Sequence, residues 1–129
     1  MPTIHESGEN YLELILEMAQ GQQEPVRSVD IARKLGVSRA SVSKALSVLR
    51  EAGMVEPAYY GKVELTEAGR QRAAEVRRRH RLLCQYLCEV LGVPRAIAEK
   101  DACRMEHVVS AEMIDRLQKA LGEPSDGNR

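Results

Sequence analysis

Apolar residues recur along most of this chain every three or four positions, which is the period of an amphipathic α-helix. The clearest stripe consists of Leu12, Ile15, Leu16 and Ala19. Helices are predicted over residues 7–20, 29–35, 39–52, 67–91, 94–108 and 111–121. Ser28, Ser38, Thr66 and Ser110 stand directly before four of these stretches, and their hydroxyls are expected to cap the first turns. The chain is therefore predicted to be mainly helical.

Residues 54–65 are the exception to the helical period. Residues 54–56 and 62–65 favour short extended segments, and Pro57-Ala58-Tyr59-Tyr60-Gly61 joins them, so this stretch predicts a β-hairpin. A short helix, a tight turn at Gly36-Val37, a second helix and a hairpin together make a winged helix-turn-helix. The predicted fold is thus mainly α, with an N-terminal winged helix-turn-helix followed by an all-helical domain.

The remaining residues set the domain boundaries. The winged helix is expected over residues 1–70 and the helical domain over residues 71–122, whereas the polar tail at 123–129 is expected to be disordered. No apolar run approaches the roughly 18 residues of a membrane span, and no signal peptide opens the chain. We therefore expect a cytoplasmic protein without membrane contact, whose three cysteines are reduced thiols.

The formal net charge of zero conceals an uneven distribution of charge. Residues 1–25 carry five Glu and no Lys or Arg, whereas residues 26–81 carry 13 Lys and Arg against 6 Asp and Glu. A basic middle segment between acidic flanks is typical of a face that contacts DNA phosphates, since that contact depends on local positive charge. The alternative is a helical subdomain with an ordinary polar surface.

The second helix of the predicted motif presents short hydroxyl and cationic side chains near its N-terminus. Such groups can reach phosphates and base edges in a major groove, and the hairpin can contact flanking phosphate or the minor groove. The predicted DNA contacts are Arg27, Ser28, Ser38, Arg39, Ala40, Ser41, Ser43, Lys44, Tyr59, Tyr60 and Lys62.

A second motif lies near the C-terminus. Cys103, Glu106 and His107 are spaced i, i+3, i+4, so within the predicted helix over 94–108 they share one face. Thiolate, carboxylate and imidazole donors together suit Fe(II), Zn(II), Ni(II) or Co(II), and suit Mg or Ca poorly. Three ligands do not close a coordination sphere, so others must come from elsewhere. The alternative is a buried Cys beside a solvated Glu-His pair.

From about residue 7 to residue 121 the chain resembles the metal-dependent repressors of the diphtheria toxin repressor and manganese transport regulator family. The likeness is strongest at Glu9-Asn10-Tyr11-Leu12-Glu13, at Arg79-His80-Arg81-Leu82-Leu83 and at residues 101–110. It implies a homodimer that binds palindromic operator DNA when loaded with Fe(II) or Mn(II) and represses metal-uptake genes. It also implies that the later helices dimerise and hold metal. Because the chain ends near Arg129, we expect a short form without the family's SH3-like domain.

The resemblance also implies a ligand set. Cys103, Glu106 and His107 match regulatory-site ligands, Asn10 and Glu13 match first-helix ligands, and His80 matches a metal-binding His of the long helix. Cys84 and Glu99 would complete an altered ancillary site with His80. The predicted metal ligands are therefore Asn10, Glu13, His80, Cys84, Glu99, Cys103, Glu106 and His107.

The departures from the family pattern bear on the metal. Asn10 stands where the iron branch has Met and the manganese branch has Asp, and Cys103 resembles the iron branch, where the manganese branch has Glu. A soft thiolate favours Fe(II), with Zn(II), Co(II), Ni(II) or Mn(II) as further candidates. Cys84 stands where a carboxylate is usual, and both Cys84 and Cys88 have the alternative of being small core residues.

Two other functions remain open at this point. A thiol redox or small-molecule sensor on the same scaffold would use the three cysteines but would leave the Glu106-His107 pair unexplained. A metallo-hydrolase would need an open metal position and a placed general base. No second constellation of that kind is visible in the sequence, so we expect a regulator that is not an enzyme.

Overall fold

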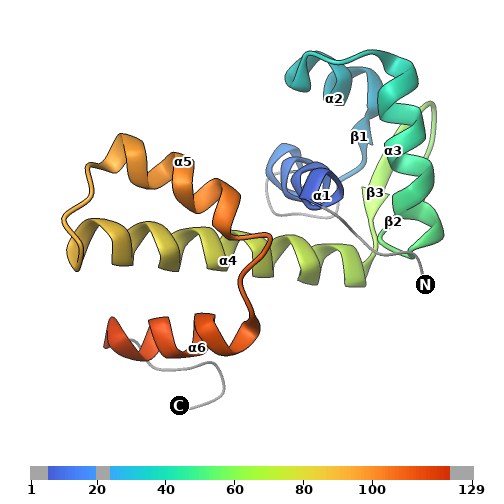
Figure 1. Cartoon of the computed structure of the whole chain (residues 1–129). Helices are drawn as coiled ribbons and strands as arrows, with labels where there is room; N and C mark the ends of the chain where they lie inside the picture. The colour runs from blue at the N-terminus through green and yellow to red at the C-terminus, as the bar shows by residue number, and fades with distance from the viewer. Residues whose placement is uncertain (1–5, 20–23, 123–129) are drawn as a thin grey trace. The chain divides into compact units, whose positions relative to one another are not determined.

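The computed structural model describes residues 6–19 and 24–122. The chain divides into two compact units, one reaching Ala74 and one beginning at Glu75. The elements of the first unit are α1 (Glu6–Met18), β1 (Val26–Arg27), α2 (Ser28–Leu35), α3 (Arg39–Glu51), β2 (Val55–Pro57), β3 (Lys62–Leu65) and the start of α4 (Glu67–Glu89). The second unit contains the rest of α4 together with α5 (Arg95–Met105) and α6 (Ala111–Ala120) (Figure 1). The predicted tail at 123–129 and the predicted end of the first helix at residue 20 lie outside the described residues.

The first unit is a winged helix-turn-helix, as the sequence predicts. The apolar stripe of α1 is buried at Leu12, Ile15, Leu16 and Ala19, and α1 packs against α3 and β3. Helix α2 packs against α3 across the turn at Gly36, whose φ of 68° is a left-handed conformation that glycine adopts without strain. This packing buries Val42 and leaves the other side of the N-terminal half of α3 exposed.

The sheet has one strand more than the predicted hairpin. Its order is β1-β3-β2, and all pairs are antiparallel. In β1, Val26 pairs with Val63. A two-residue strand has too short a pattern to be seen in a sequence, because it exists only through its pairing with β3.

Three of the four predicted helix caps are confirmed. The hydroxyl of Ser38 accepts a hydrogen bond from the backbone N–H of Ser41 at 3.1 Å, and that of Ser110 accepts one from Met113 at 3.1 Å. The hydroxyl of Thr66 accepts one from Gly69 at 3.1 Å. These bonds satisfy donors that the first turn of a helix leaves unpaired.

The predicted cap at Ser28 is wrong. Helix α2 begins at Ser28 itself, with Arg27 as the N-cap residue and no side-chain cap. The hydroxyl of Ser28 instead donates to the carbonyl oxygen of Gly61 at 3.0 Å, and the backbone N–H of Ser28 donates to the same oxygen at 3.1 Å. Pairing of β1 with β3 therefore decides where α2 begins.

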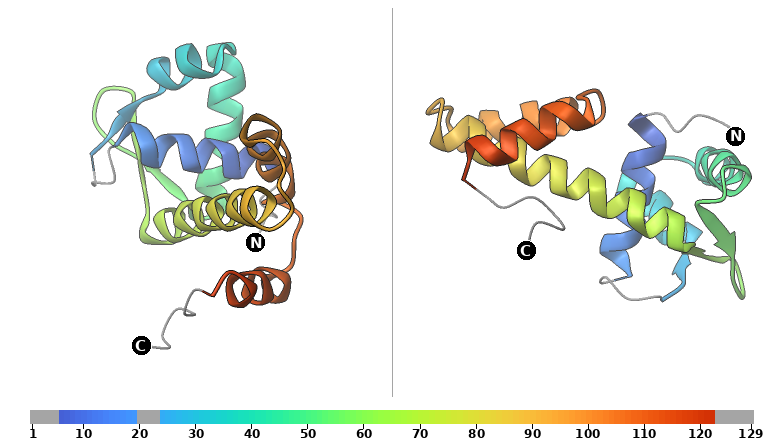
Figure 2. Two further views of the ribbon diagram at one scale, coloured as in Figure 1. Left: turned by 90° about the vertical axis from the view of Figure 1, so that its left-hand side faces the viewer. Right: turned by 90° about the horizontal axis from the view of Figure 1, so that it is seen from below.

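The second unit is built around the later part of α4, with α5 and α6 alongside it (Figure 2). Its buried side chains are Leu82, Leu83, Cys84, Ala98, Ala102, Ile114 and Leu117. Two predicted boundaries are corrected: Pro94 is the N-cap of α5 and not its first residue, and α5 ends at Met105 and not at Val108. Among the described residues, no helix is long and apolar enough to cross a membrane.

Candidate DNA-contacting face and metal centre

The exposed face of α3 carries the side chains that the sequence assigns to DNA contact. Arg39, Ala40, Ser41, Ser43 and Lys44 are all exposed. The Ser38 cap fixes where the helix starts and hence which residues follow in its first two turns. Buried Val42 and Leu49 anchor the opposite side of the helix in the core. The result is a polar helical face of the kind that enters a major groove.

A groove of about 660 Å³ lies between this helix and the sheet. Its charged and hydroxyl-bearing lining residues are Arg27, Ser28, Arg39, Ser43, Ser47, Arg50, Glu56, Tyr60 and Lys62. Arg50 and Ser47 are missed by the sequence prediction, although they follow Arg39 and Ser43 at helical spacing and could have been found from that period. Four cations against one carboxylate make the groove suitable for a polyanion.

The wing ends in a tight turn with an unusual residue. The N–H of Lys62 donates to the carbonyl oxygen of Tyr59 at 3.1 Å, and the two residues between them, Tyr60 and Gly61, have φ values of 55° and 72°. Positive φ at both central positions defines a type I′ turn, where Asn-Gly is preferred and Tyr is strained. Tyr60 is nevertheless 95% exposed and Tyr59 81% exposed, so no burial compensates for the strain within the described residues.

The second unit brings several predicted metal ligands together. The carboxylate of Glu106 is only 1% exposed and lies between two imidazoles. Its Oε1 is 2.8 Å from Nδ1 of His80, and its Oε2 is 3.2 Å from Nε2 of His107. A buried carboxylate requires such partners, because an unpaired buried charge is very costly.

The other nitrogen of His80 extends this cluster to α5. Nε2 of His80 lies 2.7 Å from Oε2 of Glu99, while Oε1 of Glu99 accepts from the Cys84 thiol at 3.5 Å and from Arg95 at 3.3 Å. Glu99 therefore contacts both partners predicted for the ancillary site. The Cys84 side chain is also buried in the core, as the alternative interpretation expects, and its role as a metal ligand stays a prediction.

These contacts shift the pKa values of the cluster. Burial lowers the pKa of His80, but hydrogen bonds to Glu99 and Glu106 and their charges outweigh it, so this pKa is raised. Hydrogen bonds from His80 and then from Cys84 lower the pKa of Glu99. Burial and then the adjacent Glu99 raise the pKa of Cys84 to about 11, so its thiol is protonated at neutral pH.

The remaining predicted ligands are Cys103 on α5 and Asn10 and Glu13 on α1. Cys103 is exposed on α5, and Cys88 is partly buried beside the second core. Because α5 ends at Met105, Glu106 and His107 lie in the following turn, so the shared helical face predicted for Cys103, Glu106 and His107 is wrong for His107. Asn10 and Glu13 are half-buried on α1 in the first unit, and their coordination with residues of the second unit stays a prediction.

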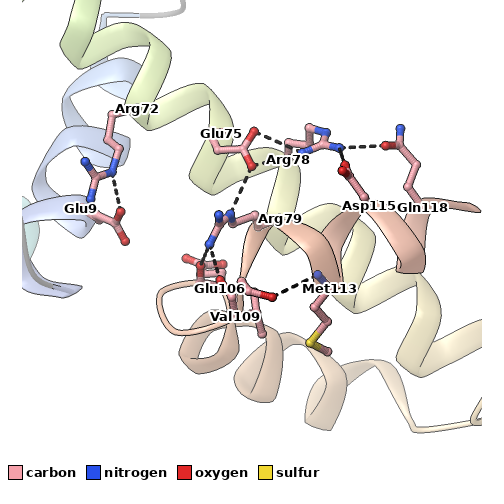
Figure 3. Close-up of polar contacts among 11 residues, drawn as sticks. Glu9, Arg72, Glu75, Arg78, Arg79, Glu106, Val109, Met113, Asp115 and Gln118 are labelled. Carbon is pink, nitrogen blue, oxygen red and sulfur yellow. Dashed lines mark hydrogen bonds and ion pairs between the residues drawn. The ribbon is translucent and has the colours of Figure 1, made fainter. Parts of the chain in front are cut away.

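Three ion pairs near these ligands are absent from the sequence prediction. Nε of Arg72 lies 2.6 Å from Oε2 of the buried Glu9, which adjoins Asn10 on α1 (Figure 3). On α4, Glu75 accepts from both Arg78 and Arg79. In a sequence, a run of arginines indicates only local positive charge. The fold is needed to show which of these arginines form ion pairs with carboxylates.

The donor types of the cluster fit a transition metal, and their present arrangement pairs them with one another. Imidazole, carboxylate and thiol groups are the ligands that borderline first-row metals prefer. Among residues 6–19 and 24–122, no three His, Cys, Asp or Glu side chains are arranged to hold a metal ion. A metal at His80 would therefore have to replace at least one of its carboxylate contacts.

Comparison with known proteins agrees with both halves of this structure. Residues 3–63 match the N-terminal DNA binding domain of iron dependent repressors, and residues 66–127 match their metal binding and dimerisation domain. The chain is 35% identical over 125 residues to the iron-dependent repressor IdeR of Mycobacterium tuberculosis, covering 97% of the chain and 54% of that protein. It thus spans about half the length of the IdeR relatives that it matches.

Two further likenesses are to a relative of higher sequence identity and to a solved structure. The chain is 41% identical over 110 residues to the transcriptional regulator MntR of Escherichia coli O157:H7, covering 85% of the chain and 70% of that protein. A solved manganese-dependent transcriptional repressor in complex with manganese superposes with a TM-score of 0.77 at 30% identity, covering 95% of this chain and 60% of the other. On these matches, the chain belongs to the iron-dependent repressor family, with the family's DNA-binding domain followed by its metal-binding and dimerisation domain.

Proposed function

We propose that this protein is a metal-dependent transcriptional repressor that binds palindromic operator DNA as a homodimer when it holds a divalent transition metal. The observation that supports this most directly is the buried carboxylate of Glu106 between His80 and His107, in a chain whose other unit is a winged helix with a cation-lined groove. The regulated genes are proposed to be metal-uptake genes, because repression on metal loading then closes a feedback loop.

The proposed metal ligands are Asn10, Glu13, His80, Cys84, Glu99, Cys103, Glu106 and His107. A bound metal would supply positive charge that attracts carboxylate, thiolate and imidazole donors. Metal binding would break at least one of the contacts that His80 and His107 now make with Glu106. The carboxylate of Glu106 would stay negatively charged. Fe(II) is the proposed physiological metal. The soft thiolate of Cys103 favours Fe(II) over Mn(II), because Mn(II) prefers oxygen donors.

The proposed homodimer uses the second unit. Val90, Leu91, Ile97, Val108 and Met113 are exposed there, and Val108 is 78% exposed. Large apolar side chains gathered in one small unit are typical of an interface. A twofold dimer presents two copies of α3 and therefore requires a palindromic operator whose half-sites are separated by about one helical turn.

The proposal is tested by metal titration read out as operator binding. An operator is first selected from a random duplex library with the metal-loaded protein, and its affinity is then measured by fluorescence anisotropy under anaerobic conditions with Fe(II), Mn(II), Co(II), Ni(II) or Zn(II). We expect every effective metal to strengthen binding at least tenfold, with Fe(II) effective at lower concentration than Mn(II).

The matched variant is His107→Ala, which removes a proposed ligand from the turn after α5. It should lose the metal response while sedimentation still shows a dimer. A variant that responds like the parent would exclude His107 as a ligand. A parent protein that binds its operator equally well in chelator would refute metal dependence, and a stronger response to Mn(II) would refute the proposed metal preference.

A further inference from the structure

Arg79 links α4 to the turn that follows α5. Its Nη1 donates to the carbonyl oxygen of Val109 at 2.8 Å and to that of Glu106 at 3.4 Å, and its Nε donates to Oε2 of Glu75 at 3.1 Å (Figure 3). The side chain is 19% exposed. One guanidinium therefore connects the middle of α4 with both ends of the segment 106–109.

This segment is the part of the candidate metal centre that the helices do not fix. Glu106 is the C-cap of α5, and the N–H groups of Val108 and Val109 both donate to the carbonyl oxygen of Met105, at 3.0 and 3.1 Å. Carbonyl groups at the end of a helix lack helical donors and need partners from elsewhere. Arg79 supplies donors to two carbonyls of a turn that carries both Glu106 and His107.

Arg79 and its neighbour His80 hold opposite ends of one residue. His80 contacts the carboxylate of Glu106 at 2.8 Å, and Arg79 contacts the carbonyl oxygen of Glu106. A metal that replaced the His80 contact would remove a partner that orients the carboxylate, and the backbone contact from Arg79 would still hold the residue. The guanidinium suits this task because its donors lie in a rigid plane and it stays charged at every physiological pH.

We propose that Arg79 is a positioning residue of the metal centre: it fixes the turn 106–109 so that Glu106 and His107 remain aligned for metal binding. This inference rests on the proposed metal-binding function of those two residues. Arg79 donates to backbone carbonyl oxygens at both ends of the turn, so its effect on the two side chains is transmitted through the backbone.

The chain provides a matched control in the adjacent arginine. Arg78 is also 19% exposed and also donates to Glu75, at 3.2 and 3.1 Å. Arg78 also donates to Oε1 of the buried Gln118 on α6, at 2.7 Å, and lies 4.0 Å from Asp115. Arg78 therefore shares the helix, the exposure and the carboxylate of Arg79, and these two contacts connect it to α6.

The experiment compares Arg79→Lys with Arg78→Lys in the full-length protein. Lysine keeps the charge but cannot bond two carbonyls and Glu75 in one plane. In the metal-free protein, hydrogen exchange of the amides at 107–109 should accelerate in Arg79→Lys and stay unchanged in Arg78→Lys. Co(II) affinity, followed by visible absorption, should fall about 10- to 100-fold in Arg79→Lys, the usual range for partners that orient metal ligands, and by less than about twofold in Arg78→Lys.

The outcomes separate this proposal from the one on which it rests. Parent-like Co(II) affinity in Arg79→Lys, or equal losses in both variants, would overturn the positioning role while leaving the metal centre intact. A parent protein that does not bind Co(II) would overturn both. If Arg79→Lys does not fold, Glu75→Gln takes its place, because it weakens the contact that orients Nε of Arg79. Unchanged turn exchange and Co(II) affinity in that variant would also overturn the proposal.

Discussion

Nδ1 of His80 lies 2.8 Å from the buried Oε1 of Glu106, while Nε2 of the same ring lies 2.7 Å from Glu99. An imidazole with a carboxylate at each nitrogen is held best when both nitrogens carry protons. Burial alone would lower the pKa of His80, but the hydrogen bonds to Glu99 and Glu106 raise it overall. When both nitrogens carry protons, the ring donates to both carboxylates and so joins α4, α5 and the following turn.

The first prediction concerns the stability of the metal-free protein as a function of pH. Because the folded pKa of His80 is raised, its contribution to stability is complete below the unfolded pKa of about 6.5 and is lost as the pH rises through the raised folded value. The difference in melting temperature between the parent and His80→Gln, measured in chelator, should therefore be largest near about pH 6 and smaller near about pH 9.

The control for this prediction is His107→Gln, which removes the other imidazole beside the Glu106 carboxylate and leaves the two contacts of His80 in place. If the difference in melting temperature between the parent and His80→Gln is constant with pH, or increases as the pH rises, the proposed contacts of a protonated His80 with Glu99 and Glu106 are contradicted. The measurement uses full-length protein, with circular dichroism at each pH to confirm that both variants are folded.

The fold was largely predictable because most of its determinants are local. The stripe of α1 and the caps at Ser38 and Ser110 each depend on residues within one or two turns of helix, and all three are confirmed. Strand β1 and the start of α2 depend on pairing with β3, more than thirty residues away in the sequence. A local sequence pattern does not show such a pairing. For this reason the sequence predicts Ser28 to be a helix cap.

The candidate metal centre was predictable in its residue types and less so in its geometry. Contacts of Glu99 with His80 and Cys84 agree with the predicted ancillary group. The end of α5 at Met105 was missed, and Arg79 contacts the carbonyls of the turn just beyond it. In the sequence, Arg79 is one of three consecutive arginines, and nothing local distinguishes it from its neighbours.

A second prediction concerns the strained wing residue. Tyr60 has a φ of 55° in a type I′ turn and is 95% exposed, so replacement by Asn, which tolerates this conformation, should stabilise the fold by about 1 kcal/mol. If the exposed ring contacts DNA, Tyr60→Asn should at the same time weaken operator binding. Urea unfolding and fluorescence anisotropy measure the two effects separately.

The neighbouring Tyr59→Asn variant serves as the comparison, because Tyr59 shares the exposed tip without the positive φ. It should not gain stability. A Tyr60→Asn protein that is more stable and binds the operator like the parent would show that the strain serves no contact with DNA. One that is less stable would contradict the turn geometry.

A third prediction concerns the helix expected to enter the major groove. Lys44 is exposed on the polar face of α3, where it can neutralise one phosphate. Lys44→Ala should therefore reduce the slope of log K against log salt concentration by about one unit and weaken binding similarly for different operators. Lys100→Ala removes an exposed charge from α5 and should leave the slope unchanged. Equal slopes in the parent and in Lys44→Ala would contradict this docking.

The last prediction distinguishes the two candidate thiol ligands. Cys84 is buried beside Glu99 with a pKa raised to about 11, so a metal can bind its sulfur at neutral pH only by displacing a proton that is held tightly. Cys103 is exposed on α5, so its sulfur is accessible from the solvent. In Co(II)-loaded protein at pH 7, the sulfur-to-cobalt charge-transfer absorption should therefore disappear in Cys103→Ser and persist in Cys84→Ser.

The control is Cys88→Ser, which removes a partly buried thiol one turn after Cys84. It should leave both the absorption and the Co(II) affinity unchanged. Persistence of the absorption in Cys103→Ser together with its loss in Cys84→Ser would reverse the assignment, and it would mean that the metal overcomes the raised pKa of the buried thiol.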